Sequence, residues 1–361
     1  MFIDDTCSSP QKITHLTQLS FFGEIEKHLK SKLPFVVFRH PNETLLTAFL
    51  DHYQSPKPKT KFVVSHFESS KHFSIYPDQT LQTDFRVDEI PSQSKQLEWN
   101  DLEQKQKNHT SLIIKAINSM QKSPLNKVVL ATALECNGLS KSPIDYFKTI
   151  LSQYKNTFNY LLFHPKYGLW MGATPERLIT MQQSHLTTMA LAGTRPLGSS
   201  SWGEKEMEEQ VFVVNEIVNT LSKYTSDASI HHADAKTIRA GQLEHLQTTI
   251  TAELTISPLE AVNALHPTPA VGGVPKEMAL DFIKTHEQMD RSLYAGFLGV
   301  IDQDKTVLYV NLRCMTIQDN KALVYVGGGI TEKSNPKDEW QEVMYKACLL
   351  YTSDAADELR S

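Results

Sequence analysis

The chain lacks long apolar runs, blocks of like charge and paired cysteines, and each absence excludes a class of protein. No stretch approaches the ~18 consecutive apolar residues of a membrane helix, so no membrane span or membrane partner is predicted. Lys and Arg total 36 against 41 Asp and Glu, and their even spread predicts no nucleic-acid partner. The four cysteines, Cys7, Cys136, Cys314 and Cys348, include no CxxC pair, which argues against a disulfide framework or a zinc knuckle.

The remaining composition is that of an ordinary globular chain. Hydrophobic residues make up 40% and charged residues 21% of the 361 positions, enough for a sizeable buried core. The first residues, MFIDDTCSSPQ, have neither the basic start nor the apolar core of a signal peptide, so we expect a cytoplasmic protein. A small anionic ligand is compatible with the net charge of -5, because a few basic groups hardly change that total.

Strands and helices are both predicted, without regular alternation. Short β-like runs cover 35–38, 61–67 and 72–77, and longer elements follow after Leu112. Further strands are expected over 127–135, 160–169, 178–181, 186–192, 293–301, 306–317 and 322–326. Helices are expected over 143–154, 204–224, 258–265, 275–289 and 336–347. This order predicts a mixed α/β fold of the α+β kind instead of a doubly wound parallel sheet.

The last fourteen residues, 348–361, differ in character from the rest of the chain. The segment CLLYTSDAADE, at 348–358, resembles the translation of a sequencing adapter. We therefore interpret 348–361 as a non-native tail, with a frayed polar tail as the alternative. On the first interpretation the natural C-terminal residues are missing, and we expect lower stability than that of a chain that has them.

Two pairs of glutamates have helical spacing. Glu206 and Glu209 lie on one expected helix, and Glu339 and Glu342 lie on another. Residues three apart share a helix face, and taken alone each pair is more often a solvated surface than a site. If the two faces meet, they offer four carboxylates, which are hard oxygen ligands that suit Mg²⁺.

Several other residues are candidates for anion binding or acid–base chemistry. Gly327 to Gly329 are expected to end a strand, where backbone N–H groups can approach an anion, but the spacing fits no nucleotide-binding motif. Arg313 falls in an expected buried strand and needs a carboxylate from the protein or from a ligand. Lys127 at a strand end and Glu176 in a turn would ordinarily be exposed.

Nine ordered segments together resemble the chorismate-utilising enzymes, the anthranilate synthase component I-like family, and most closely their isochorismate-forming branch. They are KVVLA (127–131), GATPERL (172–178), ALAGTRPLG (190–198), the helix of Glu206 and Glu209, HLQTTITAEL (245–254), LHPTPAVGGVPKEMAL (265–280), DRSLYAGFLGVID (290–302), NLRC (311–314) and GGGITEKSNPKDEWQE (327–342). The resemblance implies a single large fold of two packed antiparallel-rich β-sheets, with helices outside and the active site in a cleft. Residues 1–108 would complete the fold without a motif, and 109–347 would form the catalytic region.

The resemblance also implies a reaction and its acid and base. In the Mg²⁺-dependent conversion of chorismate to isochorismate, water adds at C2 while the C4 hydroxyl departs. Lys127 takes the family's position for the base that activates water, which requires its unprotonated form. Glu176 takes the position of the acid that protonates the leaving hydroxyl, which requires a raised pKa near pH 7.

The metal and the substrate receive residues by the same resemblance. Glu209 and Glu342 would bind Mg²⁺ directly, with Glu206 and Glu339 reaching it through water. The substrate-binding residues would be Arg313 and Tyr294 on the enolpyruvyl carboxylate, backbone amides near Gly327 and Gly329, and His245, Ala270 and Leu312 beside the substrate. Many relatives have histidine where this chain has Gln210; glutamine can still donate a hydrogen bond to a metal-bound carboxylate, so we expect little effect of this difference.

The residues also discriminate within the family. Aminodeoxychorismate synthases have a lysine where this chain has Ala192, and the ammonia-using anthranilate synthases lack the base at Lys127. Salicylate synthases share Lys127 and Glu176 and go on to eliminate pyruvate; Ala270 favours an enzyme that stops at isochorismate. Salicylate synthase and a catalytically impaired chorismate-binding protein are the alternatives. The resemblance implies a monomer and leaves the menaquinone and siderophore pathways open.

Overall fold

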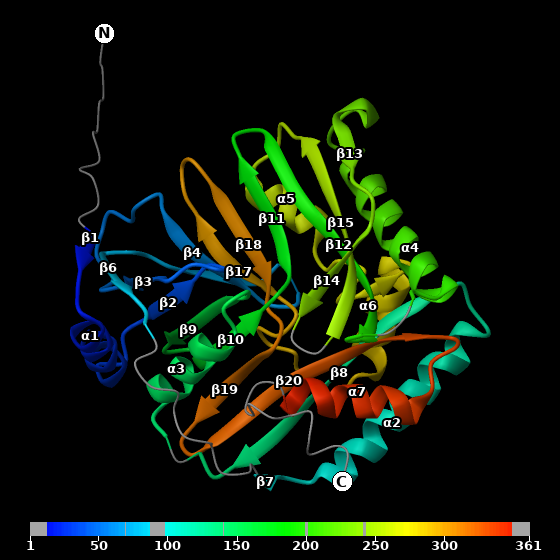
Figure 1. The fold of residues 1–361 in the computed structure, drawn as a ribbon, viewed down its shortest axis with the longest axis horizontal. Helices are drawn as coiled ribbons and strands as arrows, with labels where there is room; N and C mark the ends of the chain where they lie inside the picture. The colour runs from blue at the N-terminus through cyan, green and yellow to red at the C-terminus, as the bar shows by residue number, and fades with distance from the viewer. Residues whose placement is uncertain are drawn as a thin grey trace.

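The computed structural model describes residues 13–68, 70–86, 98–139, 141–198, 201–240 and 243–348. Cys7 and residues 349–361 of the expected tail lie outside these ranges. Within them the chain forms two large β-sheets with helices on their outer faces (Figure 1). The predicted fold class, a mixed α/β fold with two antiparallel-rich sheets, is confirmed.

The first sheet has eleven strands and spans the N-terminal and C-terminal parts of the chain. Its order is β1 (Ile13–His15), β6 (Gln79–Asp84), β3 (Leu45–Leu50), β2 (Phe35–Arg39), β9 (Phe158–His164), β10 (Gly168–Thr174), β19 (Cys314–Gln318), β20 (Lys321–Thr331), β8 (Lys127–Asn137) and β16 (Gly273–Val274), with β7 (Glu98–Trp99) also beside β8. Only the β1–β6 pairing is parallel among the described strands of this sheet.

The second sheet has nine strands, and its described pairings are antiparallel. Its order is β13 (Ile230–His232), β15 (Leu243–Glu253), β12 (His185–Pro196), β11 (Arg177–Gln182), β18 (Thr306–Val310), β17 (Phe297–Ile301), β4 (Lys61–Ser65) and β5 (His72–Ile75), with β14 (Lys236–Ala240) also beside β15. The helices are α1 (Gln18–Lys30), α2 (Leu102–Met120), α3 (Pro143–Gln153), α4 (Glu204–Leu221), α5 (Pro258–Leu265), α6 (Lys276–His286) and α7 (Pro336–Cys348).

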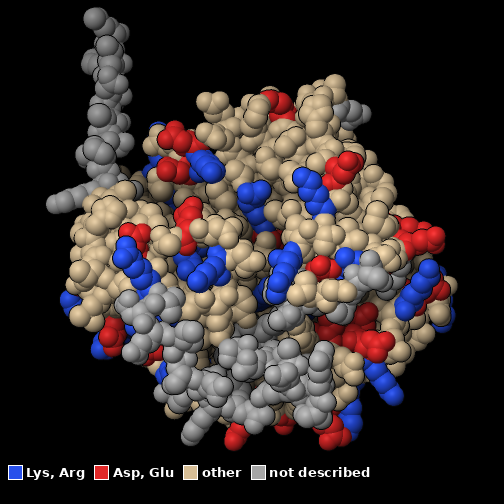
Figure 2. Space-filling model, in the orientation of Figure 1, with Lys and Arg blue, Asp and Glu red and all other residues tan. Residues whose placement is uncertain are grey.

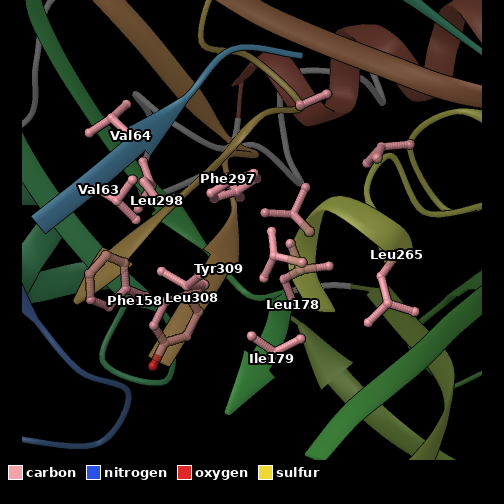
Figure 3. Packing of buried hydrophobic residues seen from close by; sticks show 14 of the residues in the cluster. Val63, Val64, Phe158, Leu178, Ile179, Leu265, Phe297, Leu298, Leu308 and Tyr309 are labelled. Atoms are coloured by element: carbon pink, nitrogen blue, oxygen red, sulfur yellow. The ribbon is translucent and has the colours of Figure 1, made fainter. Parts of the chain in front are cut away.

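The main core lies between the two sheets. Phe158 of β9 stacks on Tyr309 of β18 with ring centroids 4.2 Å apart, and aliphatic side chains of β4, β11 and β17 surround this pair (Figure 3). Val128 and Leu130 of β8 point to the other face, where they pack under α2 and α6. Because side chains alternate along a strand, Lys127 and Val129 are left to face the space between the sheets.

Two predicted strands are wrong because the chain turns inside them. The expected strand 160–169 is a hairpin of β9 and β10, with its turn at 165–167 and Gly168 at φ +74°. The expected strand 306–317 breaks at 311–313 into β18 and β19, which belong to different sheets. Arg313 therefore lies in a connection instead of a strand, and β17 begins at Phe297, after a turn that contains Tyr294.

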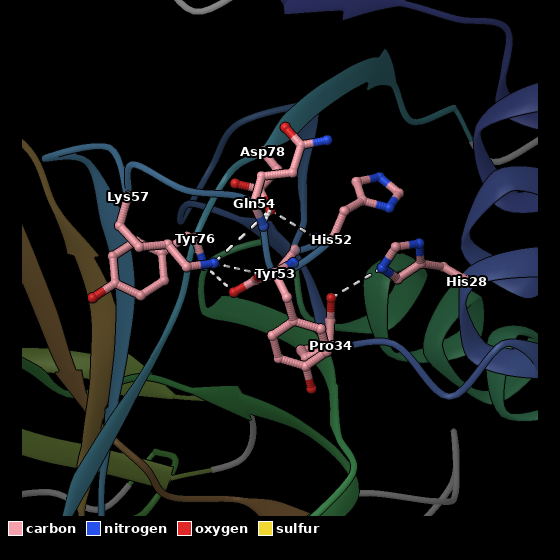
Figure 4. A network of polar contacts seen from close by, with 9 residues as sticks. His28, Pro34, His52, Tyr53, Gln54, Lys57, Tyr76 and Asp78 are labelled. Carbon is pink, nitrogen blue, oxygen red and sulfur yellow. Dashed lines mark hydrogen bonds and ion pairs between the residues drawn. The ribbon is translucent and has the colours of Figure 1, made fainter.

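The N-terminal part completes both sheets. β2 pairs with β9, and β4 pairs with β17. The loop between β3 and β4 is fixed by Asp78, whose carboxylate accepts from the amides of His52 and Gln54 at 2.8 and 3.0 Å (Figure 4). The expected division at 108/109 lies inside α2, and the functional separation of the two parts stays a prediction.

The helices and the charged side chains on the surface bear on the predictions about membrane and nucleic-acid partners. None of the described helices is both long and apolar enough to cross a membrane. On the face shown in Figure 2, Lys and Arg side chains stand among Asp and Glu without a continuous basic surface. The absence of nucleic-acid and membrane partners stays a prediction.

Candidate active site

One cavity of about 220 Å³ brings all the predicted site residues together. It is lined by side chains or backbone from both sheets, from α4 and α7, and from the connections between them. The predicted residues on its wall are Lys127, Glu176, Glu206, Glu209, His245, Ala270, Tyr294, Leu312, Arg313, Gly327, Gly329, Glu339 and Glu342. Their shared location is a structural fact, and the role of each stays a prediction.

Two connections between the sheets place Glu176 and Arg313. The chain passes from β10 in the first sheet to β11 in the second at Pro175 and Glu176, and it returns from β18 to β19 at 311–313. β10 pairs with β19 and β11 pairs with β18, so the two connections are neighbours. The residues that join the sheets thus lie side by side at one end of the cavity.

Glu176 is buried, although its position in a turn predicts exposure. Only 5% of the residue is exposed, and its carbonyl accepts from the Val310 amide at 3.0 Å. Burial raises the pKa of Glu176 to about 7, and the nearby charge of Lys127 acts in the opposite direction. The carboxyl is therefore partly protonated near neutral pH, as an acid catalyst requires.

Arg313 is held by an unusual backbone conformation. Its φ is +47°, in the left-handed region, and its carbonyl accepts from the Ala173 amide at 3.0 Å. Gly172 faces it with no room for a side chain, since a Cβ there would lie 3.0 Å from the Arg313 carbonyl oxygen. Burial lowers the pKa of the Arg313 guanidinium, which nevertheless remains a cation at neutral pH.

Lys127 begins β8 and is 7% exposed. Its Nζ lies 2.5 Å from Oε1 of Glu209 in α4. β16 approaches its backbone so closely that a Cβ at Gly273 would lie 2.2 Å from the Lys127 carbonyl oxygen. The predicted position of Lys127 at the start of a strand is confirmed. Its burial was not predicted, because the residues that cover it lie on α4 and in the loop before α6.

The three glycines lie within a strand instead of ending it. Gly327 to Gly329 pair with 129–131 of β8, and β20 continues to Thr331. A Cβ at Gly327 would lie 2.9 Å from the Tyr294 hydroxyl, and one at Gly329 would lie 3.0 Å from Cε of Lys127. These glycines therefore make room for two predicted site residues. β19 stops pairing at Tyr325, so this edge of β20 faces the cavity beyond that point.

The four glutamates predicted to bind Mg²⁺, called here the metal-site glutamates, line the cavity, and three of them have a cationic or hydroxyl partner. Glu209 pairs with Lys127, and Glu342 pairs with Nζ of Lys346 at 2.7 Å. Oε1 of Glu339 accepts from the Ser334 hydroxyl at 2.6 Å. Within the described ranges, no three Asp, Glu, His or Cys side chains lie close enough together to hold a metal ion. The donors fit Mg²⁺ by their chemistry, since all four are hard oxygen ligands on one cavity wall.

Lys346 is a cavity residue that the sequence interpretation missed. Its Nζ donates to the carbonyl of Gly327 at 3.0 Å as well as pairing with Glu342. The sequence spacing could have predicted this position, because a lysine four residues after Glu342 lies on the same helix face. The charges of Lys346 and Arg313 add to burial in lowering the pKa of His245 to about 4, so this histidine is neutral at pH 7.

The prediction that Gln210 can donate a hydrogen bond to a metal-bound carboxylate is wrong. Its amide oxygen accepts from the Ala192 amide at 3.0 Å, and its NH₂ donates to the Ala190 carbonyl and the Thr248 hydroxyl. The side chain is 2% exposed and makes its hydrogen bonds to β12 and β15. Both donors are used there, so Gln210 anchors α4 to the second sheet instead of binding a carboxylate.

The chain is similar to several isochorismate synthases. The isochorismate synthase MenF of Haemophilus influenzae is 27% identical over 90% of this chain and 75% of its own length. The salicylate biosynthesis isochorismate synthase of Pseudomonas aeruginosa is 34% identical over 49% of this chain and 40% of its own length, so this chain matches less than half of that protein. The structure of MenF, the menaquinone-specific isochorismate synthase of Escherichia coli, superposes with a TM-score of 0.76 at 22% identity, over 88% of this chain and 87% of the other.

The family comparison covers most of the chain. Residues 62–352 match the model of the chorismate binding enzymes, a range that includes every residue on the cavity wall and most of both sheets. The expected resemblance is thereby confirmed over a longer stretch than the nine motifs span. The chain belongs to the chorismate-binding enzyme family.

Proposed function

We propose that the protein is an isochorismate synthase, an isomerase that converts chorismate to isochorismate with Mg²⁺. The observation that carries the proposal is a buried carboxyl, Glu176, with a pKa of about 7 in the same cavity as Lys127. A carboxylic acid and an amine that line the same cavity can serve as the acid and the base of a reaction that adds water at one carbon and removes hydroxide at another. The similarity to two isochorismate synthases supports the choice within the family.

The cavity cations account for substrate binding. Chorismate has two carboxylates, and Arg313 would bind the one on the enolpyruvyl arm through its planar guanidinium. Burial raises the pKa of Tyr294, so its hydroxyl remains a hydrogen-bond donor beside Gly327. His245 is neutral, and we assign it contact with the substrate but no proton transfer.

The acid and the base start from different states. Glu176 holds its proton in about half of the molecules at pH 7 and can pass it to the departing C4 hydroxyl. Lys127 pairs with Glu209, and it can activate water at C2 only in its unprotonated form.

Glu209 and Glu342 would hold Mg²⁺ directly, with Glu206 and Glu339 acting through water. When bound, Mg²⁺ supplies a charge that neutralises the ring carboxylate of chorismate and fixes its position. Lys127 and Lys346 pair with these two carboxylates and supply positive charge beside them. We further propose a cytoplasmic monomer.

The test is to incubate the protein with chorismate, with Mg²⁺ or with a chelator, and to separate the products by chromatography. A metal-dependent isomer peak that approaches equilibrium with chorismate is the expected result. Salicylate together with pyruvate would move the protein to the lyase branch. Chorismate binding without any product would leave a binding protein and refute the enzymatic proposal.

A further inference from the structure

The outer edge of β8 carries no strand partner over its middle residues. β16 pairs only with Lys127 and Val128, and β7 pairs only with Cys136 and Asn137. Among the described strands, none pairs with the stretch in between on this edge. A strand edge next to catalytic side chains exposes N–H and C=O groups that need partners to stay in place.

Two side chains continue the ladder where β16 ends. Nη2 of Arg291 donates to the Val129 carbonyl at 2.7 Å, and Oε2 of Glu287 accepts from the Ala131 amide at 3.0 Å. The two side chains bind each other through two hydrogen bonds, of 2.6 and 2.8 Å, and each is 3% exposed. A buried, bidentate ion pair thus takes the place of the missing strand residues.

The same pair reaches two other parts of the cavity wall. Nη1 of Arg291 donates to the Val271 carbonyl at 3.1 Å, next to Ala270 in the loop before α6. The Arg291 carbonyl accepts from the Tyr294 amide at 2.8 Å. The guanidinium is covered by the Phe67 ring, 4.2 Å from its centroid. The guanidinium therefore holds two segments of the cavity wall, β8 and the loop before α6, and the backbone of the same residue holds the turn that contains Tyr294.

We propose that the Glu287–Arg291 pair is a positioning device for the reaction, which sets Lys127 and the Ala270 loop relative to each other. This inference rests on the proposed function. Neither side chain lines the active-site cavity, so neither is a catalytic residue. The pair holds the backbone of Val129 and Ala131, and the side chains at 127 and 129 point from this strand into the cavity.

A role in stability alone explains the pair poorly. A buried ion pair contributes little net stability compared with apolar side chains of similar volume, because both charges must be desolvated. The pair instead fixes the relative positions of its partners, because a planar guanidinium donates to Val129, Val271 and Glu287 at fixed angles. A lysine at the same place keeps the charge but cannot make these bonds together.

The test compares Arg291→Lys with Arg39→Lys as a matched control. Arg39 is equally buried, at 3% exposure, and donates to Asn159 and to the Leu151 carbonyl, away from the cavity. Both variants should lose thermal stability. Only Arg291→Lys should lower kcat, by about 10- to 100-fold, because displacing a catalytic group by about 1 Å has effects of this size. The KM for chorismate should change by less than about threefold, since Arg313 lies in another connection and the Arg291 carbonyl that accepts from the Tyr294 amide is kept in the variant.

Amide hydrogen exchange gives a second measurement that does not depend on turnover. Exchange at 127–131 should become faster in Arg291→Lys and stay unchanged in Arg39→Lys. If Arg291→Lys does not fold, Glu287→Gln replaces it; the glutamine keeps an oxygen for the Ala131 amide and removes the charge, so the same changes should be smaller.

Equal losses of kcat in the two arginine variants, or unchanged exchange at 127–131, would overturn the positioning role. A wild-type protein that forms no isochorismate would instead refute the proposed function. Hydrogen exchange would then still decide whether the pair holds β8.

Discussion

Replacing Glu176 by glutamine should remove activity and at the same time stabilise the protein at alkaline pH. Glutamine has nearly the same shape but cannot donate a proton to the departing hydroxyl, so kcat should fall by about 10²- to 10⁴-fold. In the wild-type enzyme Glu176 must hold its proton and Lys127 must lose its proton, so the pH profile of kcat/KM should be bell-shaped.

The stability change follows from the pKa of the same group. The pKa of Glu176 rises from the ordinary 4.5 to about 7 in the folded chain, so the folded state holds this proton more tightly than the unfolded state does. This contribution is present below pH 4.5 and is lost as the pH rises through 7. At about 1.4 kcal/mol per pKa unit, the loss is about 3 kcal/mol. Glu176→Gln lacks this loss and should gain about that amount relative to wild type between pH 4.5 and pH 8.

Urea unfolding at pH 4.5 and pH 8 measures the gain, and product chromatography measures the activity. Glu103→Gln is the matched control, because this glutamate is 82% exposed on α2 and away from the cavity. It should change neither quantity. A Glu176→Gln variant that keeps wild-type turnover, or whose stability difference from wild type is the same at both pH values, would show that Glu176 is not the buried acid described here.

The other predictions concern the base, the metal ligands and one buried histidine. Lys127→Ala should abolish turnover while chorismate binding, measured by calorimetry, stays within a few-fold; near wild-type isomerisation would remove Lys127 as the base. Glu209→Gln and Glu342→Gln should each raise the Mg²⁺ concentration needed for half-maximal activity, and an unchanged titration would exclude that residue from the metal site. His109 of α2 is buried against Trp340 of α7, and burial lowers its pKa from 6.5 to about 4, so the folded state should lose about 3 kcal/mol as the pH falls from 6.5 to 4. His109→Phe should remove that part of the acid sensitivity, and an unchanged pH dependence of unfolding would contradict the assignment.

The helices that carry the metal-site glutamates were predictable, and the break between β18 and β19 was not. α4 and α7 show apolar residues at helical spacing, so their ranges follow from sequence to within a few residues. The segment 306–317 contains neither Gly nor Pro and reads as one strand. The break arises from distant contacts of Asn311, which accepts from the Tyr160 hydroxyl at 2.6 Å and donates to the Leu293 carbonyl at 2.9 Å. Such contacts leave no local signal.

The candidate site was predictable in its members but not in its electrostatics. The roles came from family resemblance, and the structure brings the same residues to one cavity. The burial of Glu176 depends on β18, more than 130 positions further along the chain, and the partner of Lys127 lies on α4. The spacing of residues in the sequence predicts neither of these two contacts. The Glu287–Arg291 pair was missed for the same reason, because its four backbone contacts lie on three different segments.

The two connections that join the sheets also limit how this chain can vary in length. Pro175 and Glu176 join strands whose registers are fixed in different sheets, and so do the residues at 311–313. Inserting one residue would shift a neighbouring strand by one position and turn its inward side chains outward. The hairpin turn between β17 and β18, at 302–305, joins neighbours within one sheet and can absorb an insertion at its exposed tip. Length changes should therefore accumulate in turns of that kind, while the two short connections beside the acid and the arginine keep their length.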